Sequence, residues 1–174
     1  MERKIWEGVR ANADKKKGLT NDVVKSFCSF LCGKDFKGVF SADRVPVKYA
    51  CLPHFIMVVN TGRRGDSRDV GKLPVGHFVT VVVSPSTVYY LDPYGLPCTQ
   101  RDLLRFFKLC RRPLACNRRQ IQDYGSMYCG VYAILFAAYA DADCPFKMRF
   151  CKKRLRKNDK KCVAYLKKLI AQRR

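Results

Sequence analysis

The sequence has few acidic residues, few histidines and none of the cysteine spacings of a common zinc site. Of its 174 residues only 14 are Asp or Glu and two are His, against 35 Lys or Arg. The ten cysteines include no Cys-x-x-Cys pair, and the two histidines do not have zinc-finger spacing. We therefore expect no metal site, no cofactor required for chemistry, and thiols that are mostly free.

Long apolar segments are also absent. Residues 129–140 form a 12-residue segment without a charged side chain, which suits a buried helix, whereas a helix that spans a bilayer needs about 20 apolar residues. The chain opens on Met-Glu-Arg-Lys-Ile-Trp without the apolar segment of a signal peptide. We expect an intracellular, reducing location and no membrane partner.

Length and composition indicate one folded domain. A chain of 174 residues in which 48% are hydrophobic can bury a substantial core. No internal repeat and no low-complexity linker divides it. We expect a single domain over residues 1–174, present as a monomer.

What the sequence has in excess is positive charge. The formal net charge is +21 and the isoelectric point is about 9.8. This excess is far beyond what solubility requires, and it indicates a polyanionic partner, of which nucleic acid is the first candidate. We expect DNA to be a partner of the chain.

Residues 147–174 concentrate this charge. They contain thirteen Lys or Arg and one acidic residue, Asp159, while apolar residues from Cys162 to Ile170 recur at helical spacing. This pattern predicts a helix that docks on the domain and turns a basic face outward. A run of like charge is often only a solvated face, but an excess of this size repels itself without a partner. The DNA-binding candidates are Lys152, Lys153, Arg154, Arg156, Lys157, Lys160 and Lys161.

Apolar patterns predict the other elements. Helical spacing over residues 20–32 follows an N-cap at Thr20, and Gly33 ends the helix. Thr99 opens the pattern of a capping box for a second helix through about residue 109. Strands are predicted at residues 36–40 and 54–60, and a hairpin at residues 77–83 and 88–91 around a Ser-Pro-Ser-Thr turn.

The hairpin brings a histidine and an aspartate together. We expect its four-residue turn to pair Val83 with Val88. Val79 then lies opposite Asp92, and His77 points to the same face as Val79. Diagonal neighbours of this kind are roughly 7–8 Å apart at the backbone, within reach of an imidazole and a carboxylate, so the two side chains can hydrogen-bond. Taken alone, each has an ordinary explanation as a strand-end histidine or a turn-forming aspartate.

Cys129 begins the segment at residues 129–140, after a turn that contains glycine and serine. In the first turn of a helix a thiol faces unpaired backbone N–H groups and the positive end of the helix dipole, both of which favour the thiolate. This environment suits a nucleophile. A small core cysteine at the start of a buried helix has the same pattern, so the assignment depends on a base nearby.

Gln122 lies seven residues before Cys129, in a short extended segment. Beside the backbone N–H of Cys129, a glutamine amide can donate a hydrogen bond to a developing oxyanion. A surface or capping amide is the alternative. With His77 as the base and Asp92 as its orienting carboxylate, the chain order His, Asp, Gln, Cys supplies every part of a thiol hydrolase.

These residues stand in motifs that resemble those of the adenovirus-type maturation cysteine proteinases (adenain-like), within the clan that includes the ubiquitin-like-protein proteases. Gly-His-Phe at residues 76–78 and Asp-Pro-Tyr-Gly at residues 92–95 resemble the family's His-Trp and Glu/Asp-Pro-Phe-Gly motifs. The block from Gln122 to Cys129 is similar to the family's Gln-to-Cys-Gly block. The likeness covers roughly residues 36–140, and Phe78 in place of Trp is a departure from it.

The resemblance implies an α+β fold in which a central mixed sheet packs against the buried helix that carries Cys129. It also implies a thiol endopeptidase that cleaves viral precursor proteins at glycine-containing sites, is stimulated by DNA, and works in the host nucleus and the virion. Members of the family can be activated by a peptide that forms a disulfide with the enzyme. Cys116 lies near the corresponding segment, but its spacing to Gln122 differs, so the need for a peptide activator stays open.

Two other functions fit parts of the pattern. An isopeptidase for ubiquitin or SUMO of the same clan shares the catalytic residues, although a charge of +21 suits such substrates poorly. A non-enzymatic basic protein that packages nucleic acid would explain the charge and make the catalytic pattern accidental. Replacement of Cys129 by Ser separates the enzymes from the packaging protein, which would keep its whole function.

Overall fold

A five-stranded sheet lies at the centre of the described structure, a computed structural model that covers residues 18–62, 76–140, 150–151 and 154–172. Outer pairs of the sheet are parallel and inner pairs antiparallel, so the sheet is mixed. The strands, in spatial as well as chain order, are β1 (Phe36–Ser41), β2 (Phe55–Asn60), β3 (Phe78–Val83), β4 (Val88–Leu91) and β5 (Leu114–Cys116).

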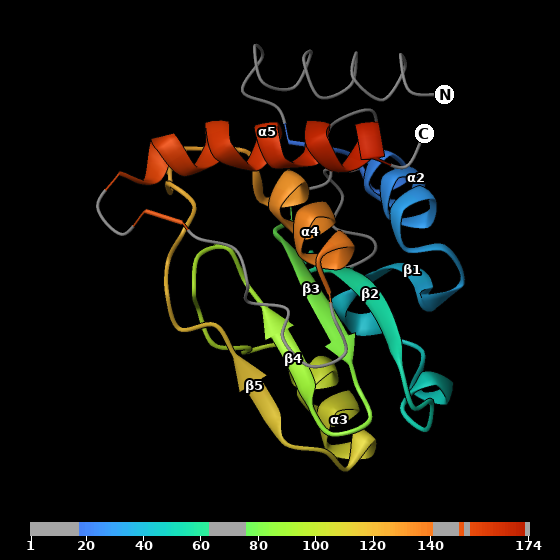
Figure 1. Cartoon of the computed structure of the whole chain (residues 1–174). Helices are drawn as coiled ribbons and strands as arrows, with labels where there is room; N and C mark the ends of the chain where they lie inside the picture. The colour runs from blue at the N-terminus through green and yellow to red at the C-terminus, as the bar shows by residue number, and fades with distance from the viewer. Residues whose placement is uncertain (1–17, 63–75, 141–149, 152–153, 173–174) are drawn as a thin grey trace.

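Helices cover both faces of this sheet (Figure 1). On one face α2 (Asn21–Cys32) and α4 (Cys129–Ala138) pack against the strands, and α5 (Leu155–Gln172) lies over α4. On the other face lies α3 (Arg101–Cys110), whose buried residues share a second core with the strands. The predicted α+β fold, with a mixed sheet against a buried helix, is therefore confirmed. Short 3-10 turns connect the elements at Gly33–Asp35, Ala42–Arg44 and Val47–Tyr49.

Alternation along the central strands divides the core in two. In β3, Phe78 and Val82 belong to the core under α2 and α4, whereas Val79 and Val81 belong to the core over α3. Every residue of β2 and β3 is buried because both strands are covered on both faces. This double coverage explains why their sequences are continuous apolar runs and show no alternation of apolar and polar residues.

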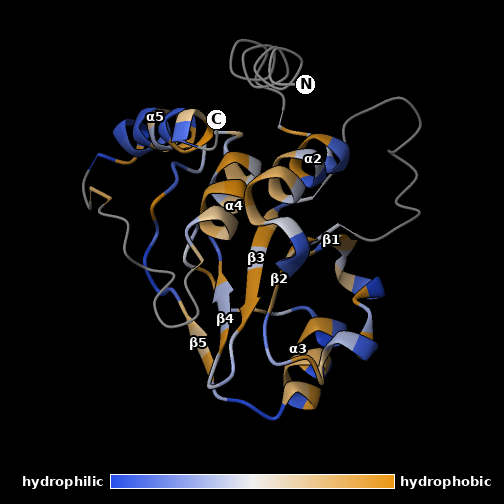
Figure 2. Ribbon diagram, turned by 45° about the vertical axis from the view of Figure 1, so that its right-hand side comes forward, coloured by the Kyte–Doolittle hydropathy of each residue, from blue (hydrophilic) through white to orange (hydrophobic). Residues whose placement is uncertain are grey.

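The helix that begins at Cys129 is buried on all sides. All residues of α4 from Cys129 to Ala137 are buried, as expected for a helix that is apolar all round. The hydroxyl of Thr80 on β3 donates a 2.9 Å hydrogen bond to the carbonyl of Ala133 and ties the helix to the sheet. Figure 2 shows the apolar colouring of α4 and of the strand beneath it.

The basic tail is a docked helix, and its inner face is more polar than predicted. Cys162, Leu166 and Ile170 of α5 belong to the core shared with α4. Asn158 and Asp159 are buried beside them, and the Tyr132 hydroxyl of α4 donates a 2.9 Å hydrogen bond to Asp159. The helix begins at Leu155, later than the predicted residue 147, and residues 147–149 and 152–153 lie outside the described residues.

Helix ends test the capping predictions. Thr20 caps α2 as predicted, accepting a 3.4 Å hydrogen bond from the backbone N–H of Val23, and Gly33 ends the helix at a positive φ of 57°. The capping box predicted for α3 is wrong. The N-cap is Gln100, one residue after Thr99, and no side chain closes that end. Arg101 and Asp102 are exposed, so the backbone N–H groups of the first turn can hydrogen-bond to water in place of a capping side chain.

Within the described part of the chain, no helix combines the length and the apolar character needed to cross a bilayer.

Candidate catalytic site

His77 is held by its own backbone at the start of β3. The Thr61 hydroxyl accepts a 3.0 Å hydrogen bond from the N–H of His77, and the Thr61 N–H donates a 2.8 Å bond to the His77 carbonyl. A Cβ at the preceding Gly76 would overlap the side-chain oxygen of Asn60, so the chain needs glycine for this close approach. These contacts fix the direction in which the imidazole leaves the backbone.

Asp92 is held in the same way at the end of β4. The side-chain amide of Asn117 accepts a 2.7 Å hydrogen bond from the Asp92 N–H and donates one to the Asp92 carbonyl. The following turn closes with a 2.8 Å bond from the Gly95 N–H to the same carbonyl. Gly95 has a φ of 69°, and a Cβ there would lie 2.5 Å from the backbone of Arg119, so only glycine fits.

The two side chains meet as the hairpin register predicted. Val83 pairs with Val88, and His77 Nε2 lies 2.7 Å from Asp92 Oδ1. The Asp92 side chain is almost fully buried, with 3% exposed, and that of His77 is 20% exposed. Because a carboxylate only accepts hydrogen bonds, Nε2 carries a proton, and Nδ1 is the ring nitrogen that exchanges protons with another group.

Cys129 supplies that other group. It is buried in the first turn of α4, and its sulfur lies close enough to the imidazole of His77 to raise the pKa of that ring. Nδ1 of His77 is buried and forms no hydrogen bond of ordinary geometry within the described residues. The sulfur is therefore close to the imidazole, and no hydrogen bond joins it to Nδ1 in this arrangement.

The surroundings of His77 favour its charged form. Burial, the largest influence, lowers the pKa of His77, but the hydrogen bond to Asp92, the charge of Asp92 and the adjacent Cys129 side chain outweigh it and raise the pKa to about 9. At pH 7 the ring is therefore mostly protonated, and both of its nitrogens carry a proton. This is the state in which histidine stabilises a neighbouring sulfur anion.

Gln122 reaches the site with both N–H groups of its side-chain amide occupied. It is fully buried, and the backbone N–H groups of Ile121 and Gln122 both donate to the carbonyl of Pro93 in the turn after Asp92. Its Nε2 donates to the Ser126 carbonyl at 2.8 Å and to the Tyr94 hydroxyl at 3.3 Å, which uses both N–H groups. The structure thus brings Gln122 to the site, while an oxyanion role requires one of these bonds to open.

Comparison with known proteins gives no assignment. No protein-family model matches the chain, and no curated protein matches it.

Three further residues contribute to the site and were not assigned a role from the sequence. Thr61 and Asn117 hold the backbones of His77 and Asp92 from positions far away in the chain, and no periodic pattern identifies them. Tyr94 stacks on the His77 ring, and its place inside the Asp-Pro-Tyr-Gly turn, next to a candidate residue, was the signal that could have found it.

Four of the seven basic candidates lie on the exposed side of α5, and Arg154 directly precedes the helix. Lys152 and Lys153 lie outside the described residues. Figure 2 shows the hydrophilic colouring of this helix on the side away from α4. One of the side chains, Arg156, also approaches Asp123 at 3.8 Å, an exposed ion pair that contributes little. The exposed candidates are Arg154, Arg156, Lys157, Lys160 and Lys161.

No metal centre and no disulfide are found at the site. Within the described residue ranges, no three His, Cys, Asp or Glu side chains are grouped so that they could hold a metal ion. None of the described cysteines forms a disulfide.

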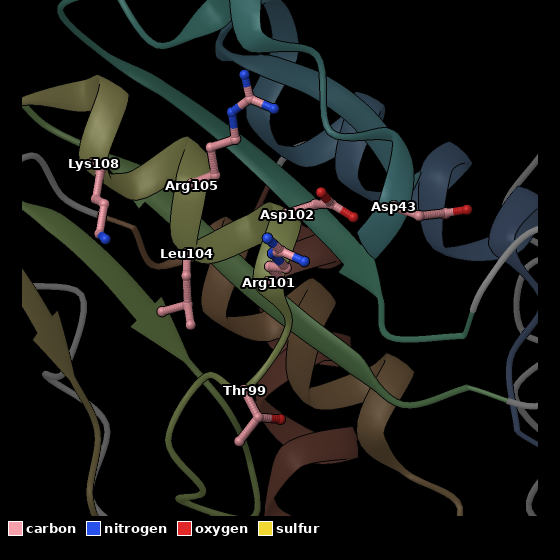
Figure 3. A pocket seen from close by; sticks show the side chains of 7 residues that line it. All are labelled: Asp43, Thr99, Arg101, Asp102, Leu104, Arg105 and Lys108. Carbon is pink, nitrogen blue, oxygen red and sulfur yellow. The ribbon is translucent and has the colours of Figure 1, made fainter.

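A hollow of about 830 Å³ lies along α3, on the opposite face of the sheet from α4, and is shown in Figure 3. Arg101, Arg105 and Lys108 line it from successive turns of the helix, together with Asp43 and Asp102. Its lining residues are separate from His77, Asp92 and Cys129, so it is not part of the candidate catalytic site.

Proposed function

We propose that the chain is a cysteine endopeptidase in which Cys129 is the nucleophile, His77 the base and Asp92 the carboxylate that orients the base. The observation that carries the proposal is the 2.7 Å hydrogen bond between His77 Nε2 and Asp92 Oδ1, formed beside a cysteine at the N-terminus of a buried helix. A thiol, an imidazole and a buried carboxylate in this order form the machinery of nucleophilic acyl transfer.

In the proposed first half-reaction, Nδ1 of His77 holds the proton that the Cys129 thiol gives up. The sulfur attacks the carbonyl carbon of a peptide bond, the C–S bond forms, and the carbonyl electrons move onto oxygen. When this intermediate collapses, the C–N bond breaks, and the leaving amine takes the proton from Nδ1. Asp92 keeps the Nε2–H bonded throughout and stabilises the imidazolium.

In the second half-reaction, water attacks the thioester and gives a proton to Nδ1. The C–S bond breaks, the acid product leaves, and the sulfur is restored. The backbone N–H of Cys129 and an amide N–H of Gln122 are the proposed donors to the oxyanion in both halves. Because both Gln122 donors are occupied, we propose that the substrate carbonyl displaces the Ser126 carbonyl or the Tyr94 hydroxyl from the amide.

DNA is the proposed activator. The exposed Lys and Arg side chains of α5 form a stripe that faces away from the core, and the net charge of +21 attracts a polyanion over a long range. On the strength of the motif resemblance, we propose viral precursor proteins with glycine-containing sites as substrates, and the host nucleus and the virion as the place of action. A peptide activator is compatible with the proposal, and no metal is required.

The test is hydrolysis of a fluorogenic peptide that ends in Gly-Gly, with and without duplex DNA. Wild type and Cys51→Ala, which removes an exposed thiol, are expected to cleave it and to cleave it faster with DNA. Cys129→Ala is expected to lose the activity. If all three proteins are inactive and bind DNA equally in a salt-dependent way, the packaging protein is the better interpretation.

A further inference from the structure

Tyr94 contacts three of the four candidate catalytic residues. Its ring lies face to face with the imidazole of His77, its backbone N–H donates a 2.7 Å hydrogen bond to Asp92 Oδ1, and its hydroxyl accepts from Gln122. We propose that Tyr94 is a positioning residue whose ring aligns His77 and whose hydroxyl holds the Gln122 amide at the site. This inference rests on the proposed cysteine protease function.

The ring contact restricts the imidazole. The two ring centroids are 4.5 Å apart and the planes differ by 19°, which is a stacked arrangement. Rotation of the imidazole about its bond to Cβ would break this contact as well as the 2.7 Å bond to Asp92. Stacking thereby fixes the plane of the ring, and the bond to Asp92 selects the orientation in which Nε2 faces the carboxylate. An aromatic face at this distance also attracts a cation, so it favours the protonated ring.

The hydroxyl connects this aligned histidine to the oxyanion side of the site. Gln122 Nε2 donates to it at 3.3 Å, and the hydroxyl donates in turn toward the Ser126 carbonyl at 3.5 Å. The 3.3 Å contact is the weaker of the two bonds that Nε2 makes, because the bond to the Ser126 carbonyl is 2.8 Å. An incoming carbonyl oxygen replaces the weaker partner first. The N–H group of Gln122 that bonds the Tyr94 hydroxyl is therefore the one that becomes available to the substrate carbonyl.

Tyr94 is itself supported from the solvent side. Tyr124, which is 64% exposed, packs on it with ring centroids 5.0 Å apart. The hydroxyl stays protonated at physiological pH, because burial, followed by the nearby Cys129, raises the pKa of Tyr94 to about 12. It therefore acts as a neutral donor and acceptor, and not as a second base.

Two substitutions separate the ring from the hydroxyl. Tyr94→Phe keeps the stack and removes only the hydroxyl, whereas Tyr94→Leu removes both, and the backbone N–H to Asp92 is present in each. With the Gly-Gly peptide, Tyr94→Phe is expected to lower kcat roughly two- to tenfold with little change in KM, the scale of one hydrogen bond. Tyr94→Leu is expected to lower kcat by about another tenfold, since the imidazole is no longer aligned.

A substrate-free readout separates this inference from the proposed function. The sequence has two histidines, so the NMR pH titration of His77 can be followed in a His54→Gln background. Tyr94→Leu is expected to lower the pKa of His77 by roughly half a pH unit, the scale of one cation–π interaction, and Tyr94→Phe is expected to leave it unchanged. Thermal unfolding of each variant checks that the fold is kept.

The outcomes are distinct. If no protein hydrolyses the peptide but His77 titrates at lower pH in Tyr94→Leu alone, the protease proposal fails and the alignment by Tyr94 stands. If wild type is active and Tyr94→Leu keeps both the wild-type kcat and the wild-type titration of His77, Tyr94 is a passive surface residue and the inference is overturned.

Discussion

At the scale of single residues, the proposed mechanism depends on the bond between His77 and Asp92. Asp92→Asn keeps the shape of the side chain and removes its charge, so the pKa of His77 is expected to fall from about 9 toward the ordinary value. The NMR titration of His77 measures the change. An unaltered titration would show that the carboxylate does not govern the histidine.

The same pair links stability to pH. A histidine whose pKa is raised by folding, here from 6.5 to about 9, stabilises the protein fully below pH 6.5 and loses that contribution as the pH rises through 9. The excess unfolding free energy of wild type over Asp92→Asn is therefore expected to shrink between pH 6.5 and 9. Urea unfolding at several pH values measures it, and a difference that grows with pH would contradict the assignment.

Gly76 offers a second test at this scale. An added methyl group overlaps the side chain of Asn60 and would lie 2.8 Å from the backbone nitrogen of Gly62, so Gly76→Ala is expected to cost roughly 1–3 kcal/mol of unfolding free energy. Gly18→Ala is the matched control, because its nearest neighbour would be at an ordinary 3.7 Å. Equal urea midpoints for the two variants would show that His77 does not depend on this close approach.

Sequence predicted the His77–Asp92 contact because a short turn fixes the register of a hairpin, and register decides which side chains face each other. The roles of Thr61, Asn117 and Tyr94 could not be predicted in this way. Thr61 and Asn117 reach partners that are distant in the chain, a contact that no local pattern encodes. The orientation of the Gln122 amide depends likewise on the Ser126 carbonyl, which only the folded loop brings close.

At the scale of elements, apolar patterns predicted the buried helices and strands and missed the short strand β5. The helix at Cys129, the docked basic helix and the central strands follow from long periodic or uncharged runs. The three-residue strand Leu114–Cys116 is only partly buried, so it carries little pattern. The N-terminus of α3 shows the opposite error, because the sequence has the pattern of a capping box at Thr99 but no side chain caps the helix.

The inner face of α5 carries a prediction of its own. Asn158 is fully buried, and its amide bonds the Ile121 carbonyl at 2.9 Å as well as both backbone groups of Cys151. Asn158→Ala is expected to lower the unfolding free energy by about 1–3 kcal/mol, since these backbone groups lose their partner. Lys160→Ala, on the exposed side of the same helix, is expected to change it by less than about 0.5 kcal/mol. Urea unfolding compares the two, and equal losses would contradict the packing described for α5.

At the scale of the whole molecule, DNA can be attracted either by the basic side chains on α5 or by the net charge of +21 as a whole. Neutralising the stripe on α5 is expected to weaken binding of duplex DNA more than neutralising an equal charge on α3, which lies across the sheet (Figure 1). The α5 variant replaces by Gln the residues Arg156, Lys157, Lys160 and Lys161. The control variant replaces by Gln the residues Arg101, Arg105 and Lys108 of α3 and Arg111, which directly follows it.

Fluorescence anisotropy over a range of salt concentrations compares these variants. The slope of the logarithm of the binding constant against the logarithm of the salt concentration is expected to fall by about 0.9 for each phosphate that α5 no longer neutralises. Identical weakening in the two variants would mean that DNA responds to net charge alone. The overall charge follows from the sequence. The sequence does not show that the basic side chains lie on the exposed side of α5 and that Asn158 and Asp159 lie on its buried side.

Covalent trapping tests whether His77 activates Cys129. A peptide ending in a Gly-Gly vinyl sulfone is incubated with the protein, and the labelled residue is located by mass spectrometry of its fragments. Wild type is expected to be labelled at Cys129, and His77→Ala is expected to slow this labelling by roughly a hundredfold or more, the scale of general-base catalysis. Labelling that spreads over exposed thiols such as Cys51 and is equally fast in His77→Ala would contradict the account.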